Sequence, residues 1–106
     1  MPFVQFVKEM MDQVSLRATD LAQEADIDIG YLGRLLSGQR KPPIQPVLLQ
    51  RLESALGVPW RRLRVESVAD RAVIAAFPRE YDLSAERRAE LAGRLAEEMA
   101  KELEEG

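Results

Sequence analysis

Apolar residues recur along this chain at intervals of three and four positions, the spacing that places side chains on one face of an α-helix. Residues 28–38 read DIGYLGRLLSG, and in this stretch Ile29, Leu32, Leu35 and Leu36 follow that spacing. No stretch of useful length alternates between apolar and polar residues with the period of two that a half-buried strand shows. The pattern therefore predicts an all-α protein.

Residues that start and stop helices divide this pattern into segments. Asp28 is a suitable N-cap for a helix over about 29–36, because its carboxylate can accept free backbone N–H groups of the first turn. Gly38 ends that helix as a left-handed cap, and Gly57 ends the next one. Helices are expected over about 3–13, 18–25, 29–36, 46–56, 67–77 and 84–103, with a short helical turn over 59–64.

The C-terminal part of the chain is interpreted as an association region. Ser67 and Asp70 have the spacing of an N-cap reinforced by an acidic residue, PREYD reads as a linker, and Ser84 is placed to cap a long last helix. The apolar stripe of that helix is too large to be left in water. We therefore expect a compact domain over 1–65 and a helical association region over 66–106. The candidate association residues are Trp60, Leu63, Leu91, Leu95, Met99 and Leu103.

The composition removes most enzyme chemistries. The 106 residues include no cysteine and no histidine, which excludes disulfides, thiolate and imidazole metal sites, and the usual pairing of a nucleophile with histidine. The glutamates of the last helix have the spacing of a solvated face rather than of a metal site. We therefore expect a protein that is not an enzyme and that uses no cofactor or metal.

The net charge of −3 conceals an asymmetry along the chain. Residues 1–64 carry nine Lys and Arg against seven Asp and Glu, a net +2, whereas residues 65–106 carry six against eleven, a net −5. A mildly basic N-terminal part is permissive for nucleic-acid binding, although many solvated surfaces share such a balance.

The chain carries no sign of a membrane segment. No apolar run approaches the roughly 18 residues of a membrane span, and the N-terminus MPFVQFVKEM lacks the basic start and long apolar stretch of a signal peptide. These features predict a cytoplasmic protein with no membrane partner.

Two short helices joined by a tight turn and followed by a basic loop form the arrangement of a helix-turn-helix. The segment LRATDLAQEADIDIGYLGRLLSGQRKP, followed by LLQRLESALGVPWRRL, closely resembles the Cro/repressor-like (XRE-type) helix-turn-helix family of phage and bacterial regulators. The resemblance covers about residues 3–64 and implies a compact five-helix bundle, which C-terminal helices extend in this chain. It also implies that the third helix of the bundle lies in the DNA major groove and that the protein binds as a two-fold dimer. The residues that carry it are Leu21, Ala22, Ala25, Ile27, Leu32 and Leu35, with the strings SGQRKP and ALGV.

The resemblance also implies roles for individual residues. The residues at or beside the base-reading positions of the family are Ile29, Gly30, Gly33, Arg34 and Ala18. The residues expected to contact phosphates are Arg17, Thr19, Tyr31, Gln39, Arg40 and Lys41. Where the family commonly carries polar side chains, often glutamine, this chain has Ile29, Gly30 and Ala18. Hydrogen bonding to bases therefore depends on Arg34, and DNA shape is expected to supply part of the sequence preference.

Several of these residues have a second interpretation. Each glycine within a helix costs roughly 0.5–1 kcal/mol relative to alanine. Gly30 and Gly33 either let the helix approach DNA closely or let it pack tightly against the first or second helix. Other candidates have a structural alternative. Solvated surface groups are the alternative for Arg34, Arg40 and Lys41, and packing residues are the alternative for Ile29, Tyr31, Trp60 and Leu63.

Two classes of function remain open at this point. The first is a sequence-specific, double-stranded DNA-binding transcriptional regulator, expected to be a repressor, that inserts helix 29–36 into the major groove as a homodimer. The second is an antitoxin or anti-repressor with a helix-turn-helix fold, which binds a partner protein through residues 67–103. The few polar side chains at the base-reading positions motivate the second class.

Overall fold

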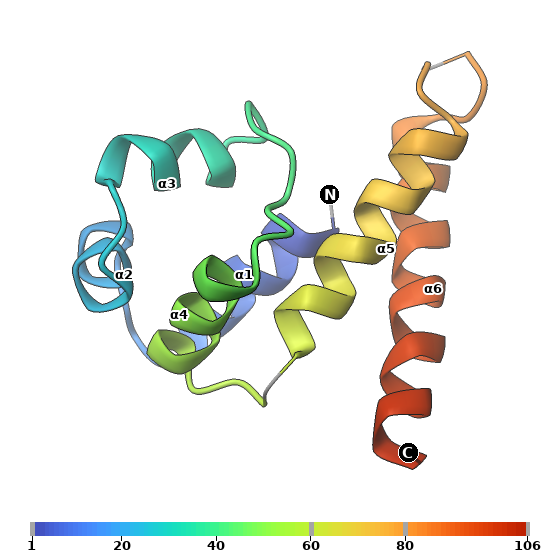
Figure 1. Cartoon of the computed structure of the whole chain (residues 1–106). Helices are drawn as coiled ribbons and strands as arrows, with labels where there is room; N and C mark the ends of the chain where they lie inside the picture. The colour runs from blue at the N-terminus through green and yellow to red at the C-terminus, as the bar shows by residue number, and fades with distance from the viewer. Residues whose placement is uncertain (1, 60, 80, 106) are drawn as a thin grey trace.

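A computed structural model describes residues 2–59, 61–79 and 81–105, and these ranges contain six α-helices (Figure 1). The helices are α1 (Pro2–Gln13), α2 (Ala18–Ala25), α3 (Ile29–Leu36), α4 (Pro46–Leu56), α5 (Arg62–Ala76) and α6 (Ala85–Glu105). The described ranges contain no strand, which confirms the all-α prediction. None of these helices is both long and apolar enough to cross a membrane.

Four of the caps expected from the sequence are present at the ends of the helices. The Asp28 carboxylate accepts the Tyr31 backbone N–H at 2.9 Å at the start of α3. Gly38 and Gly57, after α3 and α4, have φ angles of 81° and 68°, a left-handed conformation that glycine adopts without a steric penalty. Ser84 accepts the Arg87 backbone N–H at 3.2 Å at the start of α6. The predicted bounds of α1 to α4 are confirmed to within one residue.

The start of α5 differs from the prediction. The helix expected to begin at Ser67 begins at Arg62, so the break between a short turn and a separate helix is absent. The buried carboxylate of Glu53 in α4 accepts the Leu63 backbone N–H at 3.0 Å and thereby caps the first turn of α5. Ser67 lies within the helix instead of capping it. The boundary predicted after residue 65 therefore falls inside one continuous helix.

The helices pack around two clusters of apolar side chains that share α5. The main core is enclosed by α1 to α4 and the start of α5. Its largest fully buried members are Phe3, Leu21, Leu32, Leu35, Leu49, Leu52, Leu56 and Leu63. A smaller cluster of Val65, Ala69 and Ala96, with Met99 beside it, joins α5 to α6. Helix α5 thus packs on α1 and α4 as well as on α6.

Two acidic residues of α5 are buried where the helices meet. Asp70 accepts the Phe3 backbone N–H at 2.8 Å. Burial raises the pKa of Asp70, and this hydrogen bond opposes the rise. Burial also raises the pKa of Glu66, against the lowering effect of Arg62, whose guanidinium lies 3.0 Å from the Glu66 carboxylate. Both carboxyl groups therefore hold a proton more readily in the folded chain than in the unfolded chain.

These raised pKa values predict that the contribution of the two carboxyl groups to stability falls as the pH rises. A carboxyl group with a raised folded-state pKa contributes stability below its ordinary pKa, which is 4.5 for Glu66, and loses that contribution as the pH rises through the raised value. In urea unfolding between about pH 4 and about pH 7, Glu66→Gln is expected to lose stability with rising pH less steeply than the parent chain. Glu86→Gln, at an exposed position of α6, is the matched control. Identical slopes for Glu66→Gln and the parent would contradict the prediction.

Candidate nucleic-acid interface

Helix α3 has one buried face and one bare face. Leu32 and Leu35 are fully buried in the main core, whereas Arg34 is exposed. Ile29, at the start of the helix, is 46% exposed and does not complete the buried face. The side of α3 that bears Arg34 is therefore open to a partner.

The two glycines of α3 have different surroundings. A Cβ atom on Gly30 would lie 3.0 Å from Asp28 Oδ2 and 3.4 Å from Arg34 Nη1, whereas a Cβ atom on Gly33 would meet nothing within 4 Å. Neither glycine is in close contact with α1 or α2, so the alternative of tight packing between helices is wrong. Gly30 leaves room for the capping carboxylate and for the Arg34 guanidinium. Gly33 leaves the surface of α3 bare.

The Arg34 side chain reaches back over the first turn of its own helix. A Cβ atom on Gly30 would have Asp28 Oδ2 as its nearest neighbour and Arg34 Nη1 as the next, at 3.4 Å. Side chains of an α-helix lean toward the N-terminus in this way. The positive charge of α3 therefore lies over its N-terminal half, which is the part that comes closest to base edges when a helix docks in a DNA groove.

A tight turn leads from α3 into the basic loop, residues 39–43 with the sequence QRKPP. The N–H groups of Gly38 and Gln39 donate to the carbonyls of Leu35 and Arg34 at 3.2 and 2.9 Å. These are the two hydrogen bonds of a Schellman motif, which satisfies carbonyls at the end of a helix. The turn fixes the direction in which the basic loop leaves α3.

The second half of the basic loop is bound to α5. Pro42 and Pro43 are buried. Arg71 Nε donates to the Pro42 carbonyl at 2.6 Å, and the Ser67 hydroxyl donates to the Pro43 carbonyl. Arg40 and Lys41 remain exposed between the turn that ends α3 and the anchored prolines.

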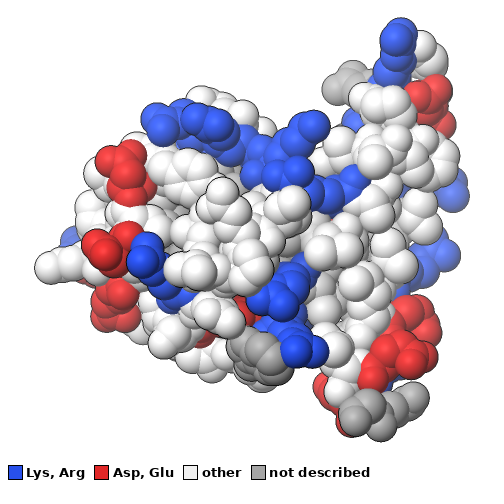
Figure 2. Space-filling model, in the orientation of Figure 1, with Lys and Arg blue, Asp and Glu red and all other residues white. Residues whose placement is uncertain are grey.

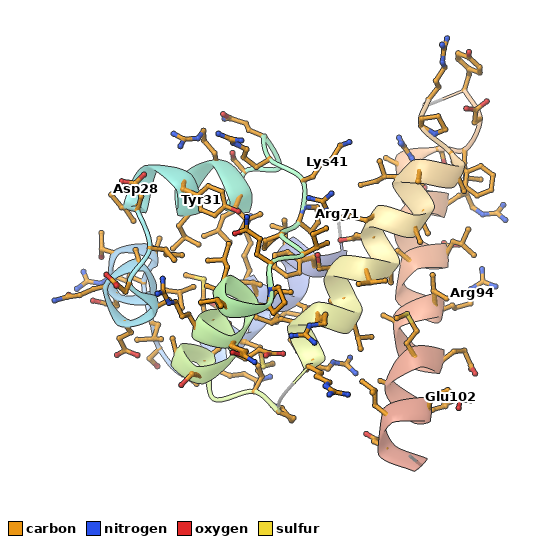
Figure 3. All side chains as sticks on the ribbon, in the orientation of Figure 1. Asp28, Tyr31, Lys41, Arg71, Arg94 and Glu102 are labelled. Carbon is orange, nitrogen blue, oxygen red and sulfur yellow. The ribbon has the colours of Figure 1, made fainter. Side chains whose placement is uncertain are left out.

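An open hollow of about 580 Å³ lies between α3, the basic loop, the start of α4 and α5. Tyr31 lines it from α3, Arg71 from α5, and Gln39, Arg40 and Lys41 from the loop (Figure 3). Lys and Arg side chains gather on the surface over the end of α3, the loop and the adjoining part of α5 (Figure 2). The hollow thus brings together four of the residues expected to contact phosphates.

Arg71 is a member of this site that the sequence analysis missed. It belongs to the region assigned to association, and no local motif marks it. Its Nε–H is used by the Pro42 carbonyl, and this bond orients the guanidinium while its Nη groups keep their donors for another acceptor. Only the packing of α5 beside the loop places this arginine next to the hollow.

The candidates at the start of α2 do not line this hollow. Thr19 is exposed, and Ala18 is half-buried against the main core. The Arg17 backbone N–H donates to the Asp20 carboxylate at 3.1 Å, and the Arg17 side chain lies 3.6 Å from the same carboxylate. These residues form a separate candidate contact.

The candidate association residues have different positions. Leu63 fills the main core, so it is not available for association. Trp60 lies outside the described residues. The remaining four are on α6: Leu91, Leu95 and Leu103 are exposed, and Met99 is half-buried.

The acidic side chains of the described chain do not gather into a metal site. No group of three or more Asp or Glu in the described ranges is placed to hold a metal ion. On α6, Glu90 lies 3.7 Å from Arg87 and Glu98 lies 3.4 Å from Lys101. The glutamates of α6 whose side chains are described are exposed.

Comparisons with known proteins found no match: no family model, no curated protein and no solved structure matches this chain.

Proposed function

We propose that the protein binds double-stranded DNA and regulates transcription, with α3 in the major groove. The proposal is based on the bare face of α3, where Arg34 lies over the first turn and the hollow lined by Arg40, Lys41 and Arg71 lies beside it. A major groove about 12 Å wide admits a helix with its side chains. Bound over a promoter the protein would block polymerase, and bound beside one it would recruit it; of these two actions we propose repression.

The two parts of the interface have different tasks. Arg34 reads base edges, because a guanidinium forms two parallel hydrogen bonds with guanine O6 and N7. Ile29 packs on thymine methyl groups. Arg40, Lys41 and Arg71 bind backbone phosphates around the hollow, which sets the position of the protein on the duplex without reading its sequence.

The proposed functional unit is a homodimer on a pseudo-palindromic site. Two copies related by two-fold symmetry place their α3 helices in successive major grooves, about 34–36 Å apart. The acidic second half of the chain repels DNA and so limits non-specific binding.

Selection of bound DNA from a random duplex pool at low salt tests this function. We expect enrichment of an inverted repeat whose half-site centres are about 10 base pairs apart. Enrichment of a single half-site would support DNA binding and contradict the dimer. A pool that stays random would contradict DNA recognition altogether.

Gly33→Ala is expected to affect stability and DNA binding in opposite directions. The added methyl group meets open space, so the free energy of unfolding should rise by roughly 0.5–1 kcal/mol, the helical advantage of alanine over glycine. The same methyl group lies on the DNA-facing side and should weaken binding to the selected duplex. Urea unfolding and fluorescence anisotropy measure the two effects.

Gly93→Ala in α6 is the matched control for this pair of measurements. A Cβ atom on Gly93 also meets nothing within 4 Å, so this variant should gain similar stability and bind DNA like the parent chain. If Gly33→Ala also bound DNA like the parent, α3 would not approach DNA at this position.

A further inference from the structure

Helix α6 carries an exposed stripe beside the face that packs on α5. Leu91 and Leu95 are 36% and 37% exposed. They continue at intervals of three and four from Arg88 to Glu98 and Glu102, so these five side chains lie on one side of the helix. We propose that a second copy of the chain docks on this stripe, with the two α6 helices antiparallel and a two-fold axis at Leu95.

The order of charges along the stripe supports the antiparallel direction. Arg88 lies toward the N-terminal end, where it is half-buried and its Nη1 donates to the Phe77 carbonyl at 3.4 Å, while Glu98 and Glu102 lie exposed toward the C-terminal end. In an antiparallel pair Arg88 of each copy faces Glu102 of the other, whereas a parallel pair sets like charges against each other. Figure 2 shows acidic residues gathered over the C-terminal half of α6. The stripe is thus complementary to a reversed copy of itself.

A hollow next to the stripe provides a place for an apolar side chain of the second copy. It has a volume of about 410 Å³. Val65 and Val68 of α5 and Met99 and Leu103 of α6 form its apolar lining, and the charged residues Arg61, Arg64 and Glu102 line it as well. Met99 and Glu102, which also line it, follow Leu95 by four and seven residues and therefore continue the same side of α6. With the axis at Leu95, Leu91 of one copy lies opposite Met99 of the other. Leu91 and Leu95 of both copies, four exposed leucines, and the two hollows are covered in one symmetric contact.

This pairing rests on the proposed homodimer but not on its DNA binding, and it is tested on the 106-residue chain without DNA. We expect the parent chain to have the mass of a dimer by sedimentation equilibrium at about 100 μM, and Leu95→Glu to have the mass of a monomer. Val14→Glu places the same change at an apolar residue that is 44% exposed and distant in sequence, and it should remain dimeric. A monomeric parent chain, or a dimeric Leu95→Glu variant, would overturn the proposal. Retained helical circular dichroism shows that the Leu95→Glu variant is folded.

Cysteine cross-linking tests the direction of the helices, because the chain contains no cysteine of its own. Leu95→Cys should cross-link to itself on oxidation, since the two-fold axis brings its two copies within reach of a disulfide. Arg88→Cys and Glu102→Cys should cross-link when the two variants are mixed and not when either is oxidised alone. Self-cross-linking of Arg88→Cys would show a parallel pair and overturn the antiparallel arrangement. DNA selection can fail while this dimer forms, and the dimer can fail while DNA binds, so the two proposals are tested separately.

Discussion

Replacing Arg34 by alanine is expected to reduce the preference for the selected duplex over a scrambled duplex by about 5- to 150-fold, equivalent to roughly 1–3 kcal/mol. The Arg34 guanidinium lies over the N-terminal half of α3 and is exposed. The described structure gives this side chain no salt-bridge partner, so the arginine can bind a guanine edge without breaking an internal ion pair. Anisotropy titrations with the two duplexes at one salt concentration measure the preference.

Arg40→Ala is the matched control for Arg34→Ala. Arg40 lines the hollow, so its removal should weaken binding to both duplexes alike. It should also lower the slope of log affinity against log salt concentration by about 0.9 for each phosphate that the variant no longer neutralises. If Arg34→Ala weakened both duplexes equally, Arg34 would bind a phosphate and the proposed base readout would be contradicted.

Leu35→Ala is expected to lower the free energy of unfolding by about 2–5 kcal/mol, the usual cost of a cavity in a packed core. Leu35 is fully buried, and its side chain fills the main core beneath α3. A loss of this size is a large part of the total stability of a small domain, which is about 5–15 kcal/mol. Urea unfolding should show it as a clear fall in the transition midpoint.

Ile29→Ala removes an apolar side chain of the same helix from its exposed side. Because Ile29 is nearly half exposed, this variant should lose about 1 kcal/mol or less of stability while binding more weakly to duplexes with thymine at the contacted position. Equal losses of stability for Leu35→Ala and Ile29→Ala would contradict the division of α3 into a core face and a contact face.

The helices that the sequence predicted correctly are those whose ends are set by nearby residues. Asp28 and Gly38 lie within two residues of α3 and make the caps that their types favour. The spacing of Leu32 and Leu35 indicates which side of α3 is buried, because burial follows the turn of the helix. The residue types within and next to these helices were therefore sufficient to predict where the helices end and which side of α3 is buried.

The features that the sequence analysis missed depend on contacts between distant residues. The start of α5 is capped by Glu53, ten residues before Leu63 and on another helix. Arg71 reaches the hollow only because α5 packs beside the basic loop. Ser67 has the type and spacing of a helix cap, yet its hydroxyl is bonded to a proline carbonyl twenty-four residues away. Spacing along the chain carries no information about such partners.

The anchoring of the proline pair to α5 has a consequence for the thermodynamics of binding. Pro42 and Pro43 have no backbone N–H, and their carbonyls are already bonded to side chains of α5. Immobilising a flexible side chain costs about 0.5–1.5 kcal/mol on association, and ordering a loop adds to that cost. A loop that is ordered in advance avoids much of this entropic penalty. The proline half of the loop is therefore already ordered in the free protein, and the proposed DNA binding would need no folding of these two residues.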